Sequence, residues 1–246
     1  MKGIVVACLL FIGAAIQAQD AKEIIRKADE KMQGLSNYTV MTIKIVRPTW
    51  EREMKMRSWS KGTDYSMIVI DAPSKDKGTV FLKRKMEIWN WLPSIDKSIK
   101  LPPSMMMQNW MGTDFTNDDL VKQSSIVNDY DQRIIGDSTI QGYECYKIEM
   151  IPKEEAAVVW GKVIIFIEKE NYLQMRVEYF DEDAYLVNLM NFYDVKEMGG
   201  RIIPTRMEMI PADSPNKKTV MIYNSIEFDI KIEENYFTTQ NMKRIR

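Results

Sequence analysis

The side chains best able to do chemistry in this sequence are carboxylates. They form two clusters, Asp114 with Asp118 and Asp119, and residues 181–183 (DED). Paired carboxylates can hydrolyse glycosides or, with waters, hold calcium. Neither cluster has the spacing of a calcium loop, with its glycine turn and distal glutamate. Structural roles are therefore favoured: Asp114 would cap a turn or a helix start, and residues 181–183 would form a solvated hairpin tip.

Other catalytic groups are scarce. The chain has no histidine, which excludes Ser-His-Asp triads, Cys-His dyads and histidine metal sites. Cys145 lies in an expected strand with no obvious thiolate stabiliser nearby, so we interpret it as a small buried hydrophobic residue. We therefore expect no enzyme activity, no cofactor and no metal site. A carboxylate-based hydrolase is the less favoured alternative, because carboxylate chemistry remains open in principle.

Composition indicates a folded protein that binds apolar material. The 246 residues are 45% hydrophobic and 28% charged, as in globular proteins. Lysine plus arginine (34) nearly balance aspartate plus glutamate (35), so nucleic acid is not an expected partner. The 19 methionines are unusually many, and this flexible, polarizable side chain suits adaptable apolar sites.

The N-terminus has the pattern of an export signal. Lys2 precedes an apolar stretch at residues 4–12, and small residues follow up to Ala18. This order is typical of a secretory signal peptide and too short for a membrane anchor. We expect a signal peptide over residues 1–18 and one domain over residues 19–246, although cleavage after Ala15 also fits.

A helix is expected at the start of the mature chain. Asp20 and Glu23 resemble a capping box, and Gly34 is placed to end the helix. Apolar residues follow the helical period between them at Ala21, Ile24, Ile25, Ala28 and Met32. The pattern predicts an amphipathic helix of about three and a half turns.

From Tyr38 onward the apolar period changes to two. Strands are expected at 38–45, 50–57, 64–71, 79–84, 86–92, 143–151, 160–168, 173–179, 184–195, 201–210, 218–224 and 226–232. Many antiparallel strands with one apolar face predict a large curved sheet or open barrel, and with the helix an α+β fold.

Residues 86–119 interrupt this pattern. They hold three of the six tryptophans and five of the 19 methionines, and after Pro103 they follow neither period cleanly. A long apolar connection in a compact domain is usually functional or mobile.

Several sequence blocks carry a family resemblance. In chain order they are residues 76–79 (DKGT), 81–82 (FL), 89–94 (WNWLPS), 97–100 (KSIK), 111–115 (MGTDF), 118–120 (DDL), 203–207 (IPTRM) and 237–238 (FT). With these blocks the sequence resembles the outer-membrane lipoprotein-sorting protein family, relatives of the periplasmic lipoprotein carrier LolA. The resemblance covers most of the mature chain.

This resemblance implies an incomplete antiparallel β-barrel around a hydrophobic cavity, with a helix and a helical or loop lid. It further implies a monomeric periplasmic carrier that binds lipoprotein acyl chains or another lipid-like ligand for transport toward the outer membrane. Its contacts with membranes or membrane proteins would be transient. A lipid-sensing regulatory module of the same fold is the alternative. The family's carrier depends on an arginine near the cavity mouth, for which Arg47 and Arg52 are the candidates.

The ligand-binding residues are expected in two groups, one in the lid region and one in the sheet. The lid region would supply Trp89, Trp91, Met105, Met106, Met107, Trp110, Met111 and Phe115, and the sheet Met54, Met56, Met67 and Met175. The reasoning is that a mobile apolar segment must close over a sheet that cannot enclose a chain alone. The competing interpretation is that these methionines form ordinary core.

Overall fold

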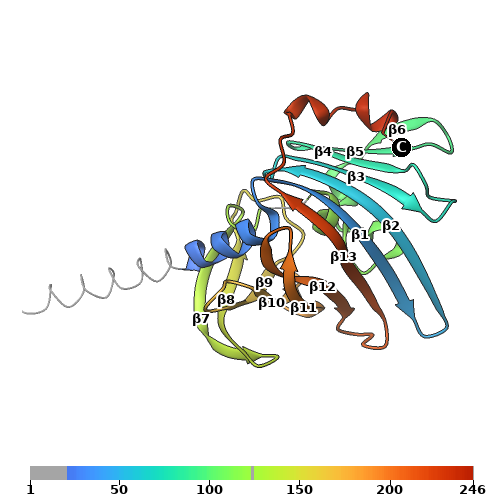
Figure 1. Ribbon diagram of the computed structural model, residues 1–246. Helices are drawn as coiled ribbons and strands as arrows, with labels where there is room; N and C mark the ends of the chain where they lie inside the picture. Colours follow the sequence, from blue (N-terminus) through green and yellow to red (C-terminus); the bar gives the residue numbers. More distant parts are fainter. Residues whose placement is uncertain (1–20, 123–124, 246) are drawn as a thin grey trace, which may run out of the picture.

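In the computed structural model, which describes residues 21–122 and 125–245, thirteen antiparallel strands form one curved sheet (Figure 1). The strands are β1 (Ser36–Arg47), β2 (Trp50–Lys61), β3 (Tyr65–Ala72), β4 (Val80–Arg84), β5 (Glu87–Leu92), β6 (Lys97–Lys100), β7 (Tyr130–Ile140), β8 (Tyr143–Pro152), β9 (Lys162–Glu168), β10 (Gln174–Phe180), β11 (Leu186–Met198), β12 (Arg201–Pro211) and β13 (Lys218–Phe228). A helix over residues 21–33 precedes them. The expected signal peptide, residues 1–18, lies outside the described residues.

The strand order explains why a segment must cross the open side of the sheet. The order is β6-β5-β4-β3-β2-β1-β13-β12-β11-β10-β9-β8-β7, so β1 pairs with β13 at the centre and β6 and β7 are the edges. Residues 101–129 join these two edges. We call residues 101–122 and 125–129 the crossing segment. It contains short helical turns η1 (Pro103–Met105), η2 (Trp110–Gly112) and η3 (Asp118–Lys122).

The main core lies on the concave face of the sheet. Ile43 and Ile45 of β1 point there, as the period of two predicts, together with their neighbours on β2. Ile24 and Ile25 of the helix pack into the same cluster, as do Trp110 and Phe115 of the crossing segment. The expected α+β fold, an unclosed antiparallel sheet with an N-terminal helix, is confirmed.

The opposite face of the sheet is covered in part. The C-terminal segment, with turns η4 (Glu234–Tyr236) and η5 (Asn241–Lys243), packs Phe237 and Met242 against β3, β4 and β5. Ile88 and Trp91 of β5 therefore face opposite ways: Ile88 belongs to the concave cluster and Trp91 to the outer one. This confirms the prediction that both faces of this strand are covered.

Three features of the sheet differ from the sequence prediction. The strands expected at 218–224 and 226–232 form the single strand β13, because a bulge at Asn224, opposite Val40 and Met41 of β1, shifts the register without ending the strand. The edge strands β6 and β7 were not predicted. Their sequences, KSIK and YDQRIIGDSTI, are polar because edge strands are exposed and are kept from pairing with other chains by charge.

Two local predictions are confirmed. Residues 181–183 lie in the turn between β10 and β11, as a solvated hairpin tip. Cys145 lies fully buried in β8, and burial raises the pKa of its thiol to about 11, so the thiolate is disfavoured at neutral pH. Within residues 21–122 and 125–245, no helix has the length and apolar character needed to cross a membrane.

Candidate functional site

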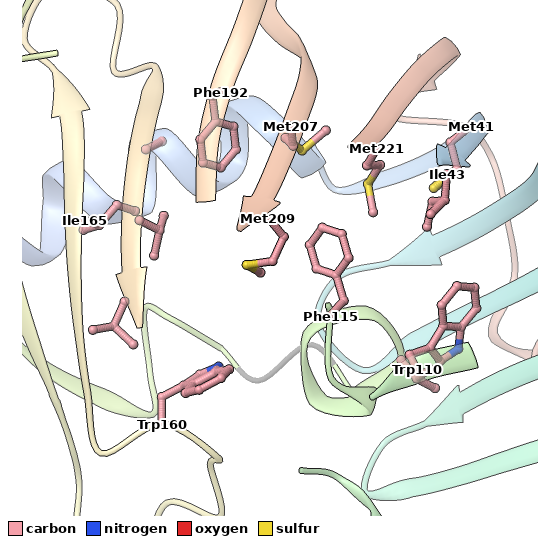
Figure 2. Close-up of a cluster of buried hydrophobic side chains, with 14 of the residues drawn as sticks. Met41, Ile43, Trp110, Phe115, Trp160, Ile165, Phe192, Met207, Met209 and Met221 are labelled. Atoms are coloured by element: carbon pink, nitrogen blue, oxygen red, sulfur yellow. The ribbon is translucent and has the colours of Figure 1, made fainter. Parts of the chain in front are cut away.

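A cavity of about 270 Å³ lies on the concave face, between the sheet, the helix and the crossing segment. Its middle is apolar, with lining residues from both halves of the sheet (Figure 2). The apolar lining contributed by the strands includes Met41, Met56, Ile68, Met150, Val163, Ile165, Val177, Met190, Phe192, Met207, Met221 and Ile226. Six of these twelve side chains are methionine, which can repack around apolar groups of different shape.

The crossing segment inserts two aromatic side chains beside this space. Trp110 and Phe115 are 1% and 3% exposed and both line the cavity. The Phe115 ring points toward Met209 and Met221 of the sheet (Figure 2). The Trp110 ring lies 5.3 Å from that of Phe81 in β4. The crossing segment therefore forms one wall of the cavity.

The backbone of residues 111–115 aims two consecutive side chains in different directions. Met111 and Gly112 have φ angles of +49° and +79°, a left-handed turn that favours glycine. The Thr113 hydroxyl donates to the Trp110 carbonyl at 2.7 Å and closes the turn. Asp114 then turns to the sheet and Phe115 into the cavity. This geometry accounts for the residue types of the MGTDF block.

A buried ion pair fixes the crossing segment to the centre of the sheet. Arg47 Nη1 and Nη2 donate to Asp114 Oδ2 and Oδ1 at 3.0 and 2.9 Å, a bidentate contact between side chains 14% and 6% exposed. The Thr219 hydroxyl of β13 also donates to Asp114 Oδ2 at 2.6 Å. The expectation that Asp114 caps a turn or helix start is therefore wrong, because its carboxylate is bound by residues distant in sequence.

Arg52 lies on β2, which forms a hairpin with β1, and it contacts the 111–115 block as well. Its Nη1 donates to the Met111 carbonyl at 3.3 Å, and its Nη2 pairs with Asp76 at 2.6 Å. Both arginines suggested by the resemblance therefore contact the crossing segment, but only Arg47 pairs with one of its charged side chains.

Asp119 makes a second set of polar contacts, within the crossing segment and with Trp160. Thr116 N donates to Asp119 Oδ2 at 2.8 Å and Asp119 N donates to the Thr116 hydroxyl at 3.1 Å, a reciprocal capping pair. Trp160 Nε1 donates to Asp119 Oδ1 at 3.0 Å. This carboxylate thus serves a structural role, as expected. Burial raises its pKa to about 6.

Stability should therefore depend on pH through Asp119. Its pKa is about 6 when folded, against about 3.9 when unfolded, so the folded state binds more protons in that window. The free energy of unfolding should fall as pH rises from about 4 to 6, with a contribution from this group of up to about 3 kcal/mol. Urea unfolding of the parent and of Asp119→Asn across pH 4 to 6.5 measures the effect.

The difference between the pH profiles of the parent and of Asp119→Asn gives the contribution of Asp119 to the free energy of unfolding. Burial also raises the pKa of Asp29 to about 6, so the variant should keep a weaker slope of the same sign. Identical pH profiles for parent and variant would show that Asp119 does not carry a raised pKa.

The structure distributes the sequence-predicted ligand residues over three clusters. Met56, Trp110 and Phe115 line the cavity. Met54, Met105, Met106 and Met111 belong to the concave cluster without lining the cavity. Met67, Trp89 and Trp91 lie on the other face with the C-terminal segment, Met175 lies in a third cluster, and Met107 is 69% exposed.

Sequence analysis missed most of the lining from the second half of the chain. The missed residues include Met150, Ile165, Val177, Phe192, Met207 and Met221. Each occupies one face of an alternating strand, so the signal was present, but alternation does not say which face is concave. Among residues 21–122 and 125–245, no group of three or more acidic or cysteine side chains is placed to hold a metal ion.

The fold matches those of solved structures described as LolA-superfamily and lipoprotein-sorting proteins. Its structure resembles an outer membrane lipoprotein-sorting protein domain from Vibrio parahaemolyticus, with a TM-score of 0.81, 21% identity and coverage of 92% of this chain and 100% of that one. A LolA superfamily protein from Nitrosomonas europaea gives 0.78, 21% identity and coverage of 89% and 98%. The resemblance inferred from the sequence blocks is confirmed at the level of the fold.

A third solved structure has a similar fold, and a family model matches the sequence. A DUF1329 family protein from Desulfovibrio piger has a TM-score of 0.81, 21% identity and coverage of 92% of this chain and 99% of that one. A family model described as "Uncharacterized protein" matches residues 62–244, and the chain belongs to that family. A comparison with curated protein sequences finds no match.

Proposed function

We propose that the protein is a periplasmic carrier that binds lipoprotein acyl chains, or another lipid-like ligand, and moves them toward the outer membrane. The observation that carries this proposal is the apolar cavity on the concave face, walled by the crossing segment. The LolA-superfamily fold supports it, since one similar structure is described as a lipoprotein-sorting domain. The mechanism is binding and release, without covalent chemistry.

The size and lining of the cavity suit an acyl chain. Ligand pockets commonly range from roughly 300 to 1,000 Å³, and this cavity is about 270 Å³ with Phe115 and Trp110 inserted beside it. Each buried methylene contributes about 0.8 kcal/mol, so six would contribute about 5 kcal/mol. A longer chain requires the two aromatic side chains to move.

The crossing segment provides the movable wall. Two polar contacts hold its central part, Arg47 with Asp114 and Trp160 with Asp119. Beside them, Trp110 and Phe115 make apolar contacts with the concave face. Separation of the Arg47–Asp114 pair would free residues 110–115 to swing outward. Release of the ligand would then follow contact with a membrane or a membrane protein that favours the open form.

Export is part of the same proposal. Lys2, the apolar residues 4–12 and the small residues before Gln19 support a cleaved signal peptide. A carrier of this kind would work between the two membranes of a bacterial envelope and would need no lipid anchor of its own.

Native mass spectrometry tests lipid binding and signal-peptide cleavage in one sample. The full-length chain is expressed in a bacterium with two membranes and purified without detergent. We expect a protein that begins at Gln19 or Ile16 and carries a mass excess equal to one lipid. A Val177→Trp variant, which fills the cavity from β10, should carry much less lipid. A parent protein that keeps Met1, or that neither carries lipid nor binds an added acyl probe, would contradict the proposal.

A further inference from the structure

Two apolar side chains stand almost free in solvent at one end of the sheet. Met86 and Leu35 are 82% and 79% exposed, more than any other large apolar side chain that the structure describes. Met86 lies in the turn between β4 and β5, and Leu35 lies between the helix and β1. Single exposed apolar residues are common on proteins, so the pair points to an interaction site only if the two belong to one surface.

Backbone hydrogen bonds place both residues on one continuous surface. The Gly62 amide donates to the Leu35 carbonyl at 2.9 Å, and the Lys85 amide donates to the Asp64 carbonyl at 2.6 Å. The turn between β2 and β3, residues 62–64, therefore lies between Leu35 and the β4–β5 turn. We call Leu35, residues 62–64 and residues 84–86 the mouth rim.

The cavity reaches the surface at this rim. Thr63, in the middle of the β2–β3 turn, is exposed and also lines the cavity. Met32 and Gln33, the last two residues of the helix before Leu35, line the cavity as well. A ligand that enters or leaves between the helix end and the β2–β3 turn passes the mouth rim.

The mouth rim carries more basic than acidic charge. Arg84 and Lys85 are exposed, and within the described part of the chain neither forms an ion pair. Of the carboxylates in these two turns and at their ends, Glu87 is paired with Lys100, which leaves Asp64. The chain as a whole has a formal charge of -1, so attraction to an anionic surface would be local and would turn the rim toward it.

We propose that the mouth rim docks the protein on a phospholipid bilayer that contains anionic lipids. Leu35 and Met86 enter the head-group layer, and Arg84 and Lys85 contact lipid phosphates. Apolar side chains beside basic ones are the combination that binds this interface. The inference rests on the proposed function and deepens it, because docking brings an opening of the cavity to the membrane that supplies or receives the acyl chain.

Flotation of the mature protein with lipid vesicles tests the docking. We expect binding to vesicles of phosphatidylcholine with phosphatidylglycerol, and binding about fivefold or more weaker to phosphatidylcholine alone, where the basic pair has no anionic partner. High salt should remove this difference. Failure to bind either kind of vesicle would overturn the docking surface. A soluble acyl probe keeps the two proposals apart: a parent that binds the probe but no vesicle is still a carrier, and one that binds only vesicles docks without being a carrier.

Variants assign the docking to the rim. Lys85→Asn should lower the affinity for the anionic vesicles about fivefold, and Met86→Ser about tenfold. Asparagine tolerates the φ of +56° at residue 85, and both side chains are exposed, so the melting temperature and the affinity for the acyl probe should not change. Ile95→Ser is the matched control, because Ile95 is 54% exposed but lies in the turn at the opposite end of β5. If Met86→Ser and Ile95→Ser bind the vesicles equally well, the mouth rim is not the docking surface.

Discussion

Replacing Arg47 by alanine is expected to lower the free energy of unfolding by about 3 to 5 kcal/mol, because a buried carboxylate loses its partner. Asp114 is 6% exposed and would keep only the Thr219 hydroxyl and weaker polar contacts. The charge cannot be rehydrated unless residues 110–115 leave the sheet. Urea denaturation measures the stability, and amide hydrogen exchange shows whether the crossing segment opens before the strands do.

The control for this variant is another arginine in a short ion pair. Arg133 contacts Glu149 at 2.8 Å, but its side chain is 72% exposed. Arg133→Ala should cost less than about 1 kcal/mol, since water replaces the partner of an exposed pair. A double variant, Arg47→Leu with Asp114→Leu, should recover much of the loss by removing both charges. Equal losses for Arg47→Ala and Arg133→Ala would contradict a special role for the buried pair.

Replacing Phe115 by alanine is expected to change stability and ligand binding in opposite directions. Truncation of a buried phenylalanine costs about 3 to 5 kcal/mol, and Phe115 is 3% exposed. The ring also occupies space beside the cavity that an acyl chain could fill. If about three more methylenes enter at about 0.8 kcal/mol each, affinity for a long acyl probe should rise by roughly 50-fold.

A second phenylalanine separates this effect from simple loss of packing. Phe166 is 4% exposed but lies in the cluster on the other face of the sheet. Phe166→Ala should lose similar stability without a gain in acyl affinity. Calorimetric titration with a long-chain acyl ester, at a temperature where each variant is folded, provides the measurement. Weaker binding by Phe115→Ala than by Phe166→Ala would show that Phe115 supports the site rather than occupying part of it.

Local sequence patterns were enough for the principal elements of the fold. The helical period from Ala21 to Met32 predicted the helix now seen at residues 21–33. The period of two predicted most strands, because a strand that packs on one face must alternate. It failed for β7, where an exposed edge needs few apolar residues. The polar edge strand β6 was missed for the same reason.

The roles of the family's sequence blocks became clear only from contacts in the tertiary structure. Asp76 of the DKGT block pairs with Arg52, and Arg52 also contacts the MGTDF block at the Met111 carbonyl. Asp114 of that block pairs with Arg47, 67 residues away in the chain. No spacing rule connects such positions, so the role of Asp114 could not be predicted from the acidic cluster alone.

The sequence by itself determined the helix, most of the alternating strands and an unusually apolar crossing region. Local backbone preference and the periodic separation of polar from apolar side chains encode these features. Only the tertiary structure decided which apolar face is concave, and hence that Met56 and Met207 line the cavity while Met67 and Trp91 pack under the C-terminal segment. The physical reason is that β3 and β5, which carry Met67 and Trp91, are covered on both faces, by the concave cluster and by the C-terminal segment. Alternation distinguishes inside from outside only where one face meets water, whereas curvature and long-range pairing place the cavity.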